Sequence, residues 1–102
     1  MFARVSRFEV PKETLAKDIA GVEATKKRIA AIPGSSGMYY LVDPDSGKTM
    51  TITLWESERA MRDSEAAASE IRGETSAAVS AKLVAVEHYD VVAKPWAPGS
   101  SS

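Results

Sequence analysis

The sequence contains no cysteine, which excludes disulfide bonds, thiolate catalysis and any zinc site built on cysteine. It has a single histidine, so one chain cannot assemble a metal site from several histidines. Neither sign of charge is in excess, because 13 lysines and arginines face 14 aspartates and glutamates, for a net charge of -1. A near-neutral surface argues against non-specific binding to nucleic acid.

Long apolar runs are also missing. No stretch approaches the roughly 18 apolar residues that a membrane-spanning helix needs, and the first residues lack the pattern of a signal peptide. We therefore expect a cytoplasmic protein that does not act at a membrane. A content of 44% hydrophobic and 26% charged residues is typical of a folded globular chain. The 102 residues suffice for one domain, expected over residues 1–93, with a loop-like, flexible tail over 94–102 that holds Trp96.

The residue pattern predicts four strands and two helices. Alternation and β-forming residues predict strands over residues 2–10, 38–42, 48–56 and 82–92, with a hairpin turn over 43–47. Apolar residues at helical spacing predict one helix over 12–31 and a second from Ser57, interrupted at Gly73. The charged side chains of the second helix are expected to form local pairs on a solvated face.

The element order βαββαβ is that of a ferredoxin-like α+β fold with a four-stranded antiparallel sheet. Two helices cover only one face of such a sheet. The other face is expected to carry the side chains of Ala3, Val5, Met50, Ile52, Leu54, Val84 and Val86. Because burial against a second copy is the simplest way to cover this apolar face, we expect a homodimer.

Residues 54–61 place the sequence Trp-Glu-Ser at the end of the third strand, directly before a capped helix. Together with Ile32-Pro33-Gly34 before the second strand and the overall length, this segment resembles the antibiotic biosynthesis monooxygenase family over residues 1–93. The resemblance implies a dimeric α+β barrel and a cofactor-independent monooxygenase-like activity, with no cofactor, on a small aromatic or quinone-type substrate. The alternative is a non-catalytic barrel that binds a small ligand. A haem-binding or peroxide-handling variant is a third reading.

The same resemblance indicates candidate catalytic residues. Trp55 matches the family's cavity tryptophan, whose indole N–H can donate to a substrate or peroxide oxygen; the alternative is a packing role, in which the ring seals the sheet against the second helix. Thr51 stands four residues earlier, where the polyketide oxygenases carry asparagine. Ser6 stands where the haem degraders carry asparagine. The second helix holds no histidine to ligate haem iron, which disfavours haem degradation.

The first two strands supply further candidates. Arg4 shares a strand face with Ser6 and Phe8, and it can stabilise an enolate or phenolate if that face lines a cavity; otherwise it is a surface charge. Phe8, Tyr39 and Tyr40 are candidate substrate-binding residues. Because neighbouring residues of a strand point to opposite faces, at most one of the two tyrosines lines a cavity.

His88 is the only side chain with an unperturbed pKa near neutrality, which makes it a candidate general base. The alternative is a structural role, since strict alternation places His88 beside Val84 and Val86 on the face expected to meet a second subunit. The two interpretations differ only in which face of the sheet the side chain occupies.

Overall fold

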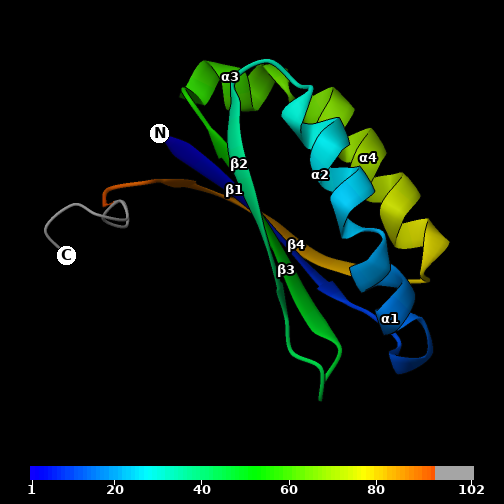
Figure 1. Ribbon diagram of the computed structural model, residues 1–102. Coiled ribbons are helices and arrows are strands. Elements are labelled where there is room, and N and C mark those ends of the chain that lie inside the picture. Colours follow the sequence, from blue (N-terminus) through cyan, green and yellow to red (C-terminus); the bar gives the residue numbers. More distant parts are fainter. Residues whose placement is uncertain (94–102) are drawn as a thin grey trace, which may run out of the picture.

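The computed structural model describes residues 1–93; the predicted tail over 94–102, with Trp96, lies outside them. One antiparallel sheet has the strand order β2-β3-β1-β4. Its strands are β1 (Phe2–Glu9), β2 (Ser35–Val42), β3 (Lys48–Trp55) and β4 (Lys82–Asp90). The helices are α1 (Lys12–Ala20), α2 (Val22–Ala30), α3 (Glu58–Asp63) and α4 (Glu65–Ala78). All four helices lie on one face of the sheet (Figure 1), which confirms the ferredoxin-like α+β fold.

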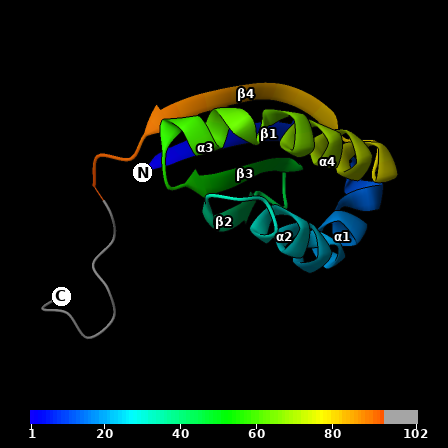
Figure 2. The ribbon, with the colours of Figure 1, turned by 90° about the horizontal axis from the view of Figure 1, so that it is seen from above.

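The two helical connections divide the covered face between them. Helices α1 and α2 lie on the side of β2 and β3, and α3 and α4 lie on the side of β1 and β4 (Figure 2). The interior of the molecule is therefore the space between two helix pairs and the middle of the sheet. Within residues 1–93, no helix combines the length and the apolar character needed to cross a membrane.

Each predicted helix is divided into two. Gly21 separates α1 from α2, and its N–H is shared between two carbonyls at 3.1 and 3.2 Å, as is common where a helix ends. The second break falls at Ser64, whereas Gly73, where it was predicted, lies inside α4. The Ser64 hydroxyl donates to the Met61 carbonyl at 2.6 Å, and such local bonds compete with helical backbone pairing. A glycine inside a helix costs only about 1 kcal/mol, too little to end a helix that packs on a sheet.

A β-bulge in β4 reverses the predicted facing of that strand. The pairing with β1 skips Val84, which is the inserted residue. Beyond the bulge, Val86 pairs with Ser6 and His88 pairs with Arg4, so both side chains share the helix-covered face. The prediction that Val84, Val86 and His88 share the uncovered face is therefore wrong, because strict alternation does not allow for the extra residue.

The middle of the uncovered sheet face is apolar, as predicted, although an ion pair between Arg7 and Glu87 also lies on this face. In the register of β1 and β3, Ala3 pairs with Leu54 and Val5 pairs with Ile52. These residues alternate with the cavity-lining Arg4, so they point away from the helices. Further side chains on or beside this face are about half exposed: Tyr39, Leu41, Val84 and Tyr89.

Candidate functional site

Two small, adjoining cavities lie between the helices and the sheet, with volumes of about 40 and 50 Å³. They share the lining residues Phe8, Thr25, Thr51 and Thr75, so they form two halves of one elongated interior space. Strand β3 presents its threonines to this space because their β-branched side chains favour a strand and alternate toward the helices. The walls are consequently rich in hydroxyl groups.

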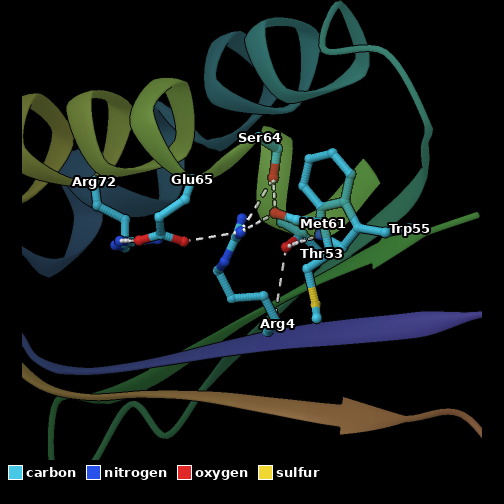
Figure 3. A network of polar contacts seen from close by, with 7 residues as sticks. All are labelled: Arg4, Thr53, Trp55, Met61, Ser64, Glu65 and Arg72. Atoms are coloured by element: carbon cyan, nitrogen blue, oxygen red, sulfur yellow. Dashed lines mark hydrogen bonds and ion pairs between the residues drawn. The ribbon is translucent and has the colours of Figure 1, made fainter. Parts of the chain in front are cut away.

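Arg4 lies at one end of this space and is almost fully buried, with 2% of its surface exposed. Its Nη2 donates to the Met61 carbonyl at 2.6 Å and to Ser64 Oγ at 3.1 Å, and it lies 2.9 Å from a carboxylate oxygen of Glu65. These acceptors come from the junction between α3 and α4 (Figure 3). The break at Ser64 therefore has a structural consequence, since it turns a hydroxyl and a carbonyl toward the guanidinium.

The remaining guanidinium nitrogens of Arg4 have no partner. Nε and Nη1 are buried, and no acceptor in the described part of the chain lies within hydrogen-bond reach of either. Of the five N–H groups of an arginine, these two atoms carry three. A buried donor without an acceptor is costly, and more so when it is charged. Arg4, whose side chain lines the interior space, thus holds donors that have no acceptor.

Glu65 connects Arg4 to Arg72. One carboxylate oxygen lies 2.9 Å from Arg4 Nη2, and the other accepts a hydrogen bond from Arg72 Nη2 at 2.8 Å (Figure 3). Partial burial raises the pKa of Glu65, but the Arg72 hydrogen bond and the positive charges of Arg4 and Arg72 outweigh it, and the pKa is lowered. For Arg4 the desolvation dominates over the attraction of Glu65, and its pKa is lowered. Two guanidinium groups therefore share one carboxylate.

Trp55 packs beside this cation at the end of β3. It is completely buried, and the Arg4 guanidinium carbon lies 5.4 Å from the centre of its ring, within the range of a cation–π contact. Its indole N–H donates to Thr53 Oγ1 at 3.0 Å. Because the indole N–H of Trp55 is already bonded to Thr53, Trp55 acts on Arg4 only through the contact between its ring and the guanidinium.

The other end of the interior space carries a phenol. Tyr40 of β2 lines it, and its hydroxyl donates to a carboxylate oxygen of Asp18 on α1. Desolvation raises the pKa of Tyr40, and the Asp18 carboxylate raises it further. The phenol therefore stays protonated and acts as a hydrogen-bond donor.

Comparison with known proteins was made for the sequence and for the fold. No protein-family model matches the sequence, and no curated protein matches it. Solved structures do match. A candidate antibiotic biosynthesis monooxygenase from Deinococcus radiodurans is 12% identical, with a TM-score of 0.73 over 97% of this chain and 100% of that one. SnoaB from Streptomyces nogalater, a cofactor-independent oxygenase, is 22% identical, with a TM-score of 0.65 over 95% of this chain and 96% of that one.

A third similar structure is the haem degrader MhuD from Mycobacterium tuberculosis, with two haems bound in its active site. It is 18% identical, with a TM-score of 0.70 over 94% of this chain and 100% of that one. The chain has the fold of the antibiotic biosynthesis monooxygenases. The resemblance seen in residues 54–61 therefore corresponds to a common three-dimensional structure.

Within this monooxygenase fold, the structure brings together five of the eight residues proposed from sequence. Arg4, Ser6, Phe8, Thr51 and Tyr40 all line the interior space. The question of whether the Arg4 face lines a cavity is thereby answered, since Arg4 is not a surface charge.

The other three candidates lie elsewhere. Trp55 adjoins the space through Arg4 without lining it. Tyr39 pairs with Ile52 on the uncovered face and is half exposed, so it does not reach the interior. His88 is exposed and lines a separate surface cleft of about 350 Å³ near α3.

The sequence interpretation missed the residues that hold Arg4. Glu65 and Arg72 were among the charged side chains expected on a solvated helix face, yet Arg72 is only 15% exposed and both belong to the network around Arg4. Their separation of seven residues places them on one helix face, which was the available signal. Nothing in the local sequence marked Ser64 or Thr53. Among residues 1–93, no group of three histidine, cysteine, aspartate or glutamate side chains is arranged to hold a metal ion.

Proposed function

We propose that this protein is a cofactor-independent monooxygenase-like enzyme that acts on a small aromatic or quinone-type molecule. The observation that carries the proposal is the buried Arg4 guanidinium, which has N–H groups without a partner and belongs to a side chain that lines a hydroxyl-rich interior space. A deprotonated phenol or anthrone can pass an electron to dioxygen without a cofactor. One oxygen atom then enters the product and the other leaves as water. The protein must stabilise the oxyanion and exclude solvent.

The residues of the interior space can meet both of these requirements. Arg4 supplies positive charge in a water-poor environment, where electrostatic stabilisation is stronger than in water. Ser6 and Thr51 lie on paired positions of β1 and β3 and add hydroxyl donors beside it. The hydroxyl of Thr51 can form a hydrogen bond in place of the asparagine side chain that the family resemblance implies at this position. Tyr40, at the far end, contributes a neutral phenol donor.

Substrate binding requires the helices to move. Cavities of about 40 and 50 Å³ hold a few water molecules, whereas sites for small organic ligands are typically about 300–1,000 Å³. Both helix pairs contribute to the walls, with Thr25 and Ile29 from α2 and Ile71 and Thr75 from α4. Separation of α2 from α4 would enlarge the space without disturbing the sheet.

A non-catalytic, ligand-binding barrel is the second candidate. It is favoured by the engaged indole N–H of Trp55, which removes the donor that the resemblance assigned to chemistry. We further propose that the protein is a homodimer paired through the uncovered sheet face, because this face exposes Tyr39 and Leu41 on β2 and Tyr89 on β4, its two edge strands. Light scattering should give twice the chain mass of 10.9 kDa, and a monomer at micromolar concentration would refute this pairing.

Oxygen uptake tests the proposed chemistry. Purified protein is mixed with a hydroxyanthrone or with smaller, easily ionised phenols, and uptake is compared with the spontaneous rate. Arg4→Gln should reduce the catalysed rate by about 100-fold or more, the usual cost of removing an oxyanion donor. Trp55→Phe should have a smaller effect, since its N–H is used internally.

Arg59→Gln provides the matched control, because this arginine is 91% exposed on α3. Circular dichroism establishes that each variant is folded. Uptake no faster than the spontaneous rate with every substrate in the series would reject the oxygenase in favour of the binding protein.

A further inference from the structure

At the Arg4 end of the interior space, positive charges outnumber negative charges by one. Arg4 and Arg72 each contact Glu65, and this single carboxylate is shared between them. Glu65 is 47% exposed, so its charge is partly screened by solvent, while Arg4 is 2% exposed. A buried guanidinium is ordinarily balanced by a buried anion. Within residues 1–93, no second carboxylate reaches Arg4.

The unbalanced charge lies beside the interior space. The N–H groups of Arg4 Nη2 are already used by acceptors of the α3–α4 junction, namely the Met61 carbonyl, the Ser64 hydroxyl and the Glu65 carboxylate. The atoms without partners, Nε and Nη1, belong to the side chain that lines the cavity of about 50 Å³. The remaining polar lining there consists of the guanidinium of Arg72 and the hydroxyls of Ser6, Thr25, Thr51, Thr53 and Thr75. This lining contributes no negative charge.

The far end of the space differs in chemistry. Ser6 pairs with Thr51, which in turn pairs with Tyr40, so Tyr40 lies two strands across from β1. With strand spacing and residue rise taken together, the Cα atoms of Arg4 and Tyr40 are about 12 Å apart. This separation is of the order of the length of a substituted two-ring aromatic molecule. At that end Tyr40 offers a neutral hydroxyl group, and Asp18 offers a carboxylate that accepts the hydrogen bond of this hydroxyl.

We infer that the ligand of this protein is an aromatic anion that is already ionised at neutral pH, with its anionic oxygen against Nε and Nη1 of Arg4 and a hydrogen-bonding group toward Tyr40. The inference rests on the proposed function for the location of the site, but it concerns binding and not oxygen chemistry. The anionic group can be a carboxylate or an acidic enolate, since both present the same charged oxygen to the guanidinium.

Calorimetric titration without oxygen tests this inference. The probes are a hydroxynaphthoate, its neutral hydroxynaphthamide counterpart, and a hydroxynaphthoquinone that ionises through its enolate oxygen. The anions should bind at least about tenfold more tightly than the amide, as expected for a hydrogen bond to a charged group. If the carboxylate binds and the enolate does not, the anionic group is a carboxylate; the reverse result identifies an enolate.

A second readout does not depend on affinity. In the ¹H–¹⁵N spectrum, the Nε–H resonance of Arg4, assigned by its loss in Arg4→Lys, should shift on binding of an anion and not of the amide. Arg4→Gln, which removes the positive charge, should also abolish the preference for anions, while Arg59→Gln should leave it unchanged. The ligand comparison within the wild-type protein remains decisive if Arg4 variants fail to fold.

Three results would overturn the inference: equal affinity for the anion and the amide, an anion preference that survives in folded Arg4→Gln, or no binding of any probe. Anion binding without oxygen uptake would leave the anion site standing and reject the oxygenase. Oxygen uptake with neutral phenols and no anion preference would do the opposite. The two proposals can therefore fail separately.

Discussion

Replacement of Thr53 by valine would test whether the indole N–H of Trp55 is a structural donor. Valine has the same shape as threonine, so the substitution opens no cavity. It removes the hydroxyl that accepts from Trp55 Nε1 at 3.0 Å and that lies 3.5 Å from the Arg4 carbonyl, a distance at which any bond is weak. Because Trp55 is 0% exposed, no solvent can replace the lost acceptor.

The expected cost follows from this geometry. A buried donor left without an acceptor costs about 1–3 kcal/mol, so Thr53→Val should lower the free energy of unfolding by about 2 kcal/mol. For a domain of this size the melting temperature would fall by about 10 °C. In a Trp55→Phe background there is no N–H to leave unpaired, and the same substitution should cost close to nothing. The coupling between the two sites is then about 2 kcal/mol.

Urea denaturation of the two single variants, the double variant and the wild type at one protein concentration measures this coupling. Thr51→Val is the matched control, since Thr51 lies two residues earlier on the same face and its hydroxyl has no partner among the hydrogen bonds of residues 1–93. Additive effects of Thr53→Val and Trp55→Phe would refute the reasoning. The indole N–H would then be independent of Thr53 and available to a ligand.

Four further substitutions test the stability of the helices and loops around the site. Gly73→Ala should raise the free energy of unfolding by about 0.5–1 kcal/mol, since no atom lies within 4 Å of the added Cβ; Gly34→Ala should lower it, because φ is 84° and the Cβ would meet Ala60 Cβ at 2.4 Å. The pKa of Glu65 is lowered on folding, so the ionised carboxylate stabilises the fold above the usual glutamate pKa of about 4.3, and this stabilisation is lost as the pH falls through the lower folded pKa. Glu65→Gln should therefore reduce the loss of stability at acid pH, which denaturation at several pH values measures. Ser57→Ala should cost about 1 kcal/mol by thermal melting, because the Ser57 hydroxyl accepts from the Ala60 N–H at 3.0 Å and caps α3.

The fold could be predicted because its signals are local. Alternation along β1 and β3, the turn over residues 43–47 and the Ser57 cap each depend on a few neighbouring residues, and all agree on one architecture. The separation of Tyr39 from Tyr40 could be predicted for the same reason, since adjacent strand residues point to opposite faces. The errors arose where one inserted residue or one side chain changed a local pattern, as at Val84 and Ser64.

The candidate site could be predicted only in part. The face that Arg4, Ser6 and Phe8 share follows from alternation, so the grouping of these residues was available from the sequence. Burial of Arg4 was not, because it depends on acceptors some sixty residues away at the α3–α4 junction. A charged residue in a strand is usually solvated, and only a tertiary partner can hold it inside.

The sequence by itself determined the ferredoxin-like order of strands and helices, the apolar character of the uncovered sheet face and the hydroxyl-bearing side of β3. These properties depend on periodicity and on the conformational preferences of individual residues. The tertiary structure alone decided that Arg4 meets Glu65, that Thr53 engages Trp55, and that His88 lies on the helix-covered side at the surface. Each of these depends on strand register and on helix placement, which join residues far apart in the chain and leave no local pattern.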